Sequence, residues 1–153
     1  MTVELASTAE GTLRGREFAA LYAQAQRFYA LQTRILDTHD TESWVHTFTE
    51  DAVVELPLLP GPVRAREGLA RYVRAGAARQ RQAGGRLDHW VGMLDVRPQA
   101  DGSLRTRCSA LAYAGPVGGG PGVLYAYVME DVLVRGQGEW CCAHRRVTRD
   151  DLA

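Results

Sequence analysis

The two halves of this sequence carry different hydrophobic periodicities, and their order restricts the fold more than any other feature. Up to about residue 82 the apolar residues recur at helical spacing, whereas from Leu87 onward they lie in β-rich segments separated by Gly-rich turns. Helices followed by consecutive strands predict an α+β domain in which a curved antiparallel sheet wraps three N-terminal helices. Because helices and strands do not alternate in the second half, a doubly wound nucleotide-binding fold is not expected.

The helical half divides at a polar elbow. Residues 16–36 place apolar side chains on one helical stripe, and the run Asp37–Thr41 interrupts it with turn- and cap-forming residues. A short second helix would then turn Trp44 and Phe48 inward, and a third helix is expected over 65–82. Asp37 lies between two helices, so a purely capping role is one interpretation of it.

The strands are bounded by strong turn signals. The expected strands are 52–56, 87–97, 104–113, 123–135 and 139–147. Asp101-Gly102 predicts a hairpin turn, and the Gly-rich segment 115–122 joins two strands, so it is not a phosphate-binding loop. Asp131 is expected to form a structural cross-strand pair with Arg145 or Arg146.

An irregular apolar loop follows the first strand. Residues 57–62 hold three prolines, which exclude regular structure, together with Leu58 and Leu59. These leucines need a partner, and either the mouth of a pocket or a dimer contact would supply one. We expect them to help bind a substrate.

Length and composition set the class of protein. The chain of 153 residues fits one domain, expected at 14–153 after a flexible polar tail at 1–13. Formal net charge is zero and no basic stripe stands out, so a nucleic-acid partner is not expected. The apolar runs are too short for a membrane span, the N-terminus lacks a secretory signal, and three cysteines without a disulfide pattern indicate the cytoplasm.

Several chemistries are disfavoured by what the sequence contains. All 18 basic residues other than histidine are arginine, so no lysine is present to form a Schiff base. The four histidines show no HxH, HxxxH or HExxH spacing, and no metal site or other cofactor is expected.

Three segments of the sequence resemble the corresponding segments of one known family. They are YALQTRILDTHDTESWVHTFTEDAVVE at 29–55, RLDHW at 86–90, and the closing hairpin from Tyr127 to Asp150. Their order resembles that of SnoaL-like proteins, within the nuclear transport factor 2-like superfamily. The resemblance implies a cone-like barrel, a homodimer formed through the open face of the sheet, and a cavity for a small, apolar or aromatic molecule.

The resemblance also implies candidate catalytic residues. Scytalone dehydratase, in the same superfamily, uses an Asp–His dyad, and its positions correspond here to Asp37 and His89. Histidine is a suitable base near neutral pH, and a carboxylate on its other nitrogen orients it. Tyr29, Trp44 or Tyr125 would then donate a hydrogen bond to a carbonyl oxygen as charge develops there.

Two classes of function remain open. The first is a cofactor-free, metal-independent dehydratase, cyclase or isomerase that acts on a polyketide-type intermediate of secondary metabolism, through His89 and Asp37. The second is a non-catalytic small-molecule-binding or accessory protein that assists a partner oxygenase in a hydroxylation step. An Asp37–His89 pair that faces an open cavity would favour the first class, and a histidine that only satisfies the strand would favour the second.

Overall fold

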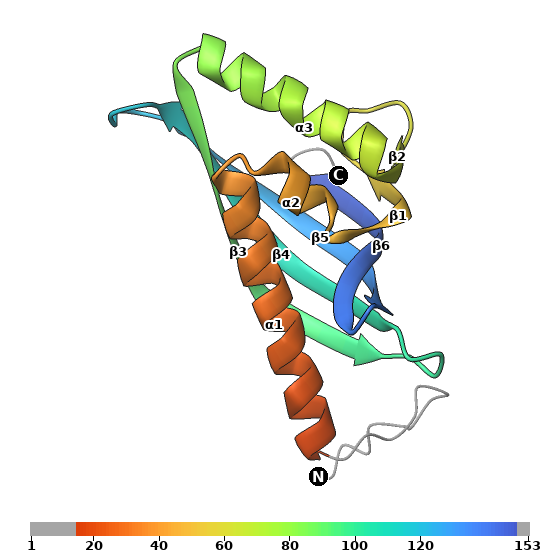
Figure 1. The fold of residues 1–153 in the computed structure, drawn as a ribbon. Helices are drawn as coiled ribbons and strands as arrows, with labels where there is room; N and C mark the ends of the chain where they lie inside the picture. Colours follow the sequence, from red (N-terminus) through yellow and green to blue (C-terminus); the bar gives the residue numbers. More distant parts are fainter. Residues whose placement is uncertain (1–14, 150–153) are drawn as a thin grey trace.

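Three helices pack against one face of a six-stranded sheet in the computed structural model, which describes residues 15–149. The predicted tail at 1–13 lies outside this range. The helices are α1 (Gly15–Asp37), α2 (Thr41–Val45) and α3 (Ala65–Gln82), and the strands are β1 (Phe48–Glu55), β2 (Val63–Arg64), β3 (Gly85–Pro98), β4 (Leu104–Pro116), β5 (Val123–Gly136) and β6 (Glu139–Arg149). Figure 1 shows α1 lying alongside β3, with α3 across the upper end of the sheet.

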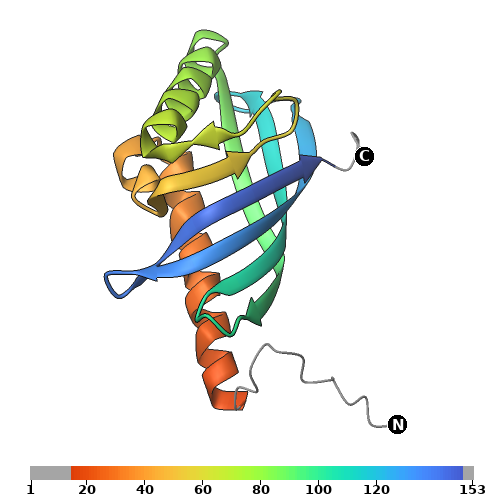
Figure 2. The same ribbon diagram turned by 90° about the vertical axis from the view of Figure 1, so that its right-hand side faces the viewer.

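The sheet is strongly curved and open, and its strand order is β2-β1-β6-β5-β4-β3 (Figure 2). The strands from β3 to β6 form an antiparallel meander, as the hairpin signals predict. Only β1 and β6 pair in parallel among the described strands. The α+β prediction, with a curved sheet on three helices, is therefore confirmed, with this one parallel pairing inside a mainly antiparallel sheet.

The first strand is longer than predicted, which moves one aromatic residue to another element. Strand β1 starts at Phe48 rather than Ala52, and α2 ends at Val45. The helix cannot continue because the backbone N–H of Thr47 folds back to the carbonyl of Trp44 at 3.0 Å, in a turn. Phe48 still points inward, where its ring packs edge-on against Trp44 at 4.8 Å between centroids.

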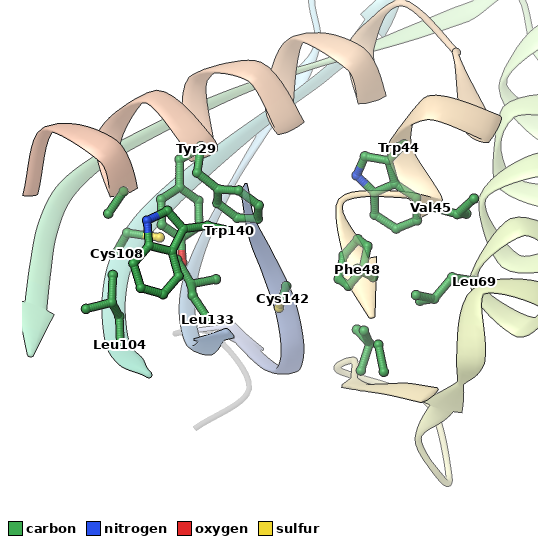
Figure 3. Packing of buried hydrophobic residues seen from close by; sticks show 14 of the residues in the cluster. Tyr29, Trp44, Val45, Phe48, Leu69, Leu104, Cys108, Leu133, Trp140 and Cys142 are labelled. Atoms are coloured by element: carbon green, nitrogen blue, oxygen red, sulfur yellow. The ribbon is translucent and has the colours of Figure 1, made fainter. Parts of the chain in front are cut away.

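The core lies between the helices and the concave face of the sheet. Figure 3 shows two groups of buried side chains, one beneath α1 and one between α2 and α3, with Cys142 between them. The largest fully buried side chains are Phe48, Leu69, Leu104, Leu133, Cys108 and Cys142. Burying a large apolar side chain contributes about 1.5–3 kcal/mol, so this layer holds α1 against the sheet and thereby positions its C-terminal end.

No helix within residues 15–149 is long and apolar enough to cross a bilayer.

Candidate active site

The C-terminal end of α1 leaves a carboxylate available for a distant contact. The chain turns at His39, whose φ of 62° lies in the left-handed region, and the next helix is capped by Asp40. Asp40 Oδ1 accepts the backbone N–H of Ser43 at 3.2 Å, and hydrogen bonding from the Ser43 side chain, and then from its backbone, holds the pKa of Asp40 below its ordinary value. Because Asp40 caps α2, Asp37 is not needed for that role, and its carboxylate points to another element.

That element is β3, which carries His89 on the concave face of the sheet. The register pairs His89 with Ala112, a buried position of β4. Asp37 Oδ1 lies 2.6 Å from His89 Nδ1, and Asp37 Oδ2 accepts the backbone N–H of His89 at 2.9 Å. The two side chains are 20% and 22% exposed, so solvent and small molecules reach them from one side.

Two contacts to one histidine have a chemical consequence. A carboxylate accepts hydrogen bonds, so the Nδ1 nitrogen of neutral His89 carries the proton and its Nε2 nitrogen carries the lone pair. The second contact, to the backbone, prevents Asp37 from rotating away. Among residues 15–149, no three His, Cys, Asp or Glu side chains are grouped to hold a metal ion. The arrangement as it stands can accept a proton at Nε2.

Both residues of the pair line a groove between α1 and β3, with a volume of about 510 Å³. We call this the α1–β3 groove. Its lining residues are Tyr22, Gln26, Tyr29, Ala30, Thr33, Arg34, Asp37, Thr38, His89, Trp90, Val91, Gly92, Met93 and Leu94. The volume suits a drug-sized molecule, and aromatic and aliphatic side chains make up much of the wall.

The predicted substrate-binding residues are distributed over three places. Tyr29 lines the groove, whereas Trp44, Leu58 and Leu59 are not among its lining residues. Trp44 is buried in the core, and Leu58 and Leu59 are 76% and 39% exposed in the proline-rich loop. Tyr125 pairs with Ala112, so it lies on the concave face two strands from His89. Their roles stay predictions.

A buried polar cluster lies under the groove at Tyr29. The Tyr29 hydroxyl donates to Asp131 Oδ2 at 2.5 Å, and it lies 2.5 Å from Thr106 Oγ1, which is therefore the donor in that second contact. Burial, and then the charge of Asp131, raise the pKa of Tyr29 far above its ordinary value. The tyrosine consequently stays protonated, with its only donor hydrogen directed at Asp131.

The same cluster contains a buried arginine. Arg145 donates to both oxygens of Asp131, each at 2.9 Å, and its Nη2 also donates to Gln32 Oε1 at 2.5 Å. Burial acts to lower the pKa of Arg145, but the charge of Asp131, together with its hydrogen bonds and smaller electrostatic contributions from neighbouring groups, outweighs burial and raises that pKa above its ordinary value. Arg145 is therefore the partner that the sequence left undecided, and Arg146 instead faces Glu55 at 3.5 Å.

Sequence reasoning missed several groove residues. On α1 a signal was present, because Gln26 and Thr33 follow the spacing of the helical face that carries Tyr22, Tyr29 and Asp37. On β3 the signal was weaker. Met93 and Leu94 are adjacent apolar residues that break the strand's alternation, which indicates a bulge but does not say what the bulge faces.

Solved structures of similar sequence support one family. A Catenulispora acidiphila protein in complex with S-DNPA is 30% identical, with 88% of this chain and 96% of that chain covered and a TM-score of 0.75. Aln2 from a Streptomyces species is 28% identical, with 92% and 96% covered and a TM-score of 0.79. ActVI-ORFA from Streptomyces coelicolor is 25% identical, with 86% and 96% covered and a TM-score of 0.78.

No curated protein matches the chain. The SnoaL-like domain matches residues 17–146, which include α2, α3, all but the first two residues of α1 and almost all of the sheet. The sequence match and the shared architecture agree with the resemblance carried by residues 29–55 and 86–90. The chain belongs to the SnoaL-like domain family.

Proposed function

We propose that this protein is a cofactor-free, metal-independent lyase or isomerase that removes a proton from a polyketide-type intermediate, with His89 as the base. The observation that carries the proposal is the two-point contact of Asp37 with His89 on the wall of the α1–β3 groove. A pair that served only the fold would not need an adjacent groove large enough for a ligand.

The chemistry follows from the tautomer of His89. Its Nε2 takes a proton from carbon next to a carbonyl group, and Asp37 stabilises the imidazolium that forms. In a dehydration, the electron pair of the C–H bond forms the new double bond, the C–O bond breaks, and the leaving hydroxide takes a proton from His89. In an isomerisation or cyclisation, the same proton returns to another atom of the substrate.

The hydrogen bonds of the aromatic candidates differ, and this ranks them as donors to the carbonyl oxygen. The Tyr29 hydroxyl hydrogen is directed at Asp131. The indole N–H of Trp44 is buried without an acceptor among the described residues, but protein atoms cover it so closely that a ligand does not reach it. Tyr125 does not line the α1–β3 groove, but it shares the concave face with His89 across Ala112, so among these three residues it is the donor that we propose for a substrate extending from the groove over the sheet.

The substrate class is proposed from the relatives. A protein 30% identical to this chain is solved with S-DNPA, and the Streptomyces neighbours have the same fold over nearly their full lengths. S-DNPA is accordingly the first compound to test. The mainly apolar lining of the α1–β3 groove suits a largely apolar or aromatic molecule.

The test is solvent exchange with S-DNPA in deuterated water. Wild-type protein is expected to accelerate deuterium incorporation or conversion of the compound, and His89→Gln is expected to lower that rate about 10²- to 10⁴-fold. His144→Gln is the matched control, because His144 bonds Glu55 at 2.9 Å on the convex face, away from the groove. Tight binding of S-DNPA with equal rates for wild type and His89→Gln would favour the non-catalytic, accessory function.

We also propose that the protein is a homodimer, formed through the convex face of the sheet. A row of alternating charges crosses five neighbouring strands there, in the order Asp95, Arg107, Glu130, Arg146 and Glu55. An alternating row is complementary to a second copy of itself that is shifted by one position.

We propose the cytoplasm as the location of the protein. The free thiols of Cys108, Cys141 and Cys142 support this location.

A further inference from the structure

Strand β3 loses its regular pairing at one place, beside the groove. Pairing with β4 skips from Gly92 to Asp95, so Met93 and Leu94 together oppose a single residue of β4. This is a β-bulge, a feature often found next to active sites, where it re-aims a side chain. Met93 has a φ of 53°, in the left-handed region that glycine adopts readily and a long side chain does not.

Packing within the protein does not offset the energetic cost of the left-handed backbone at Met93. The side chain of Met93 belongs to the wall of the α1–β3 groove and yet is 87% exposed, so it packs against little of its own chain. A glycine would fit the backbone better. Strained residues of this kind persist mainly where they contribute to binding or to a switch.

The distance along the strand determines what Met93 can contact. His89 and Met93 are four residues apart on β3, which corresponds to about 13 Å at the usual rise of a strand. Helix α1 runs beside β3 in the opposite direction, so the groove extends away from the Asp37 end of the helix (Figure 1). Only an elongated ligand held at His89 reaches Met93.

We infer that Met93 determines the length of ligand that the groove selects, by covering the end of an apolar molecule whose other end lies at His89. The inference rests on the proposed function in one respect, that the α1–β3 groove is where substrate binds. Methionine suits the role because its unbranched, polarisable side chain adapts to irregular apolar surfaces.

Two fused-ring probes of different length test this inference. Binding of anthracene-2-carboxylate and of naphthalene-2-carboxylate to the full chain would be measured by calorimetric titration. Met93→Ala removes the side chain and keeps the left-handed backbone, Met93→Gly removes the side chain and the strain, and Met93→Leu keeps an apolar side chain. Leu124→Ala is the control, because Leu124 is similarly exposed, at 60%, and does not line the groove.

We expect Met93→Ala and Met93→Gly to weaken binding of the anthracene probe about five- to tenfold, with less than a twofold effect on the naphthalene probe. Met93→Leu and Leu124→Ala should stay within about twofold of wild type for both. Equal losses for the two probes, unchanged binding in the Met93 variants, or no binding of either probe by wild type would overturn the inference. Because these are binding measurements, they stand whether or not His89→Gln abolishes turnover.

Discussion

Asp131 and Arg145 form a two-point ion pair in the interior of the protein, on the neighbouring strands β5 and β6. The carboxylate of Asp131 is fully buried and the side chain of Arg145 is 8% exposed. Both oxygens of Asp131 accept from Arg145, and Tyr29 and Gln32 complete the cluster from α1. A buried charge is tolerated only when it is paired and hydrogen-bonded, and here that pairing links the sheet to the helix that carries Asp37.

Removing the charge of Asp131 should therefore destabilise the fold strongly. We expect Asp131→Asn to lower the free energy of unfolding by about 3–5 kcal/mol, because it leaves Arg145 buried without a counter-charge. Chemical unfolding in urea measures the effect. Glu139→Gln is the matched control, since Glu139 is exposed at the start of β6 and lies outside the charged row of the convex face, and its cost should stay within about 0.5 kcal/mol. Equal losses in the two variants would contradict this account of the pair.

The three cysteine thiols should differ in reactivity. Burial, and then the nearby Asp131, raise the pKa of Cys108 to about 12 and raise that of Cys142 as well, and both side chains are buried. Cys141 is partly exposed, with a pKa that burial raises to a lesser extent. At pH 8 the thiolate fraction of Cys108 is about one in ten thousand, so only Cys141 should react with Ellman's reagent in the native state, and all three after unfolding.

The same shifts give stability a pH dependence of known sign. A pKa that is higher in the folded state favours the protonated thiol there. The contribution of Cys108 to stability is therefore fully present below the ordinary thiol pKa of 9.0 and is lost as pH rises from 9 through about 12. Urea unfolding at pH 8 and pH 10 should show the lower midpoint at pH 10. For the Ellman's reagent experiment, reaction of two or more thiols of the native protein at pH 8 would contradict the burial of Cys108 and Cys142. For the pH experiment, an unchanged or higher midpoint at pH 10 would contradict the raised pKa of Cys108.

The sequence predicted the positions of the helices and strands better than it predicted which distant segments and side chains pair with one another. Periodicity locates the helices and the meander because burial of one face leaves a local pattern, and α3 begins and ends where that pattern does. Pairing between distant segments leaves no such pattern. The parallel contact of β1 with β6 and the choice of Arg145 over Arg146 depend on strand register. The register of β5 with β6 shifts by one residue between Val132 and Leu133. Asp37 and His89, 52 residues apart, were connected only through the family resemblance.

The proposed homodimer predicts a specific effect of charge reversal. Wild-type protein should elute at twice the chain mass of 16.8 kDa on calibrated size-exclusion chromatography. Glu130→Arg places three arginines in adjacent positions of the convex row, with Arg107 and Arg146 on either side, and should shift elution toward the monomer. Arg79→Glu on α3 is the control and should elute as wild type. A wild-type monomer at all concentrations would contradict the proposal.

Replacing Asp37 by asparagine tests whether the carboxylate orients the ring of His89, because asparagine keeps the size of the side chain. The site presents two donors, the backbone N–H and Nδ1–H of His89, and each takes one oxygen of Asp37. Asparagine keeps the size but has one oxygen and an N–H₂ group. Either one donor loses its partner, or the ring adopts the other tautomer, in which Nε2 carries the proton and cannot act as a base.

We therefore expect Asp37→Asn to lower kcat for S-DNPA by about 10²- to 10⁴-fold, with its Kd nearly unchanged, because the loss lies in proton transfer rather than in binding. Asp40→Asn is the matched control. It removes the same charge three residues away, and asparagine is as good a helix cap as aspartate, so α2 and the elbow stay in place. A similar loss of kcat in both variants would mean that Asp37 acts through the net charge of the elbow, and the orientation of His89 would then not be what drives the reaction.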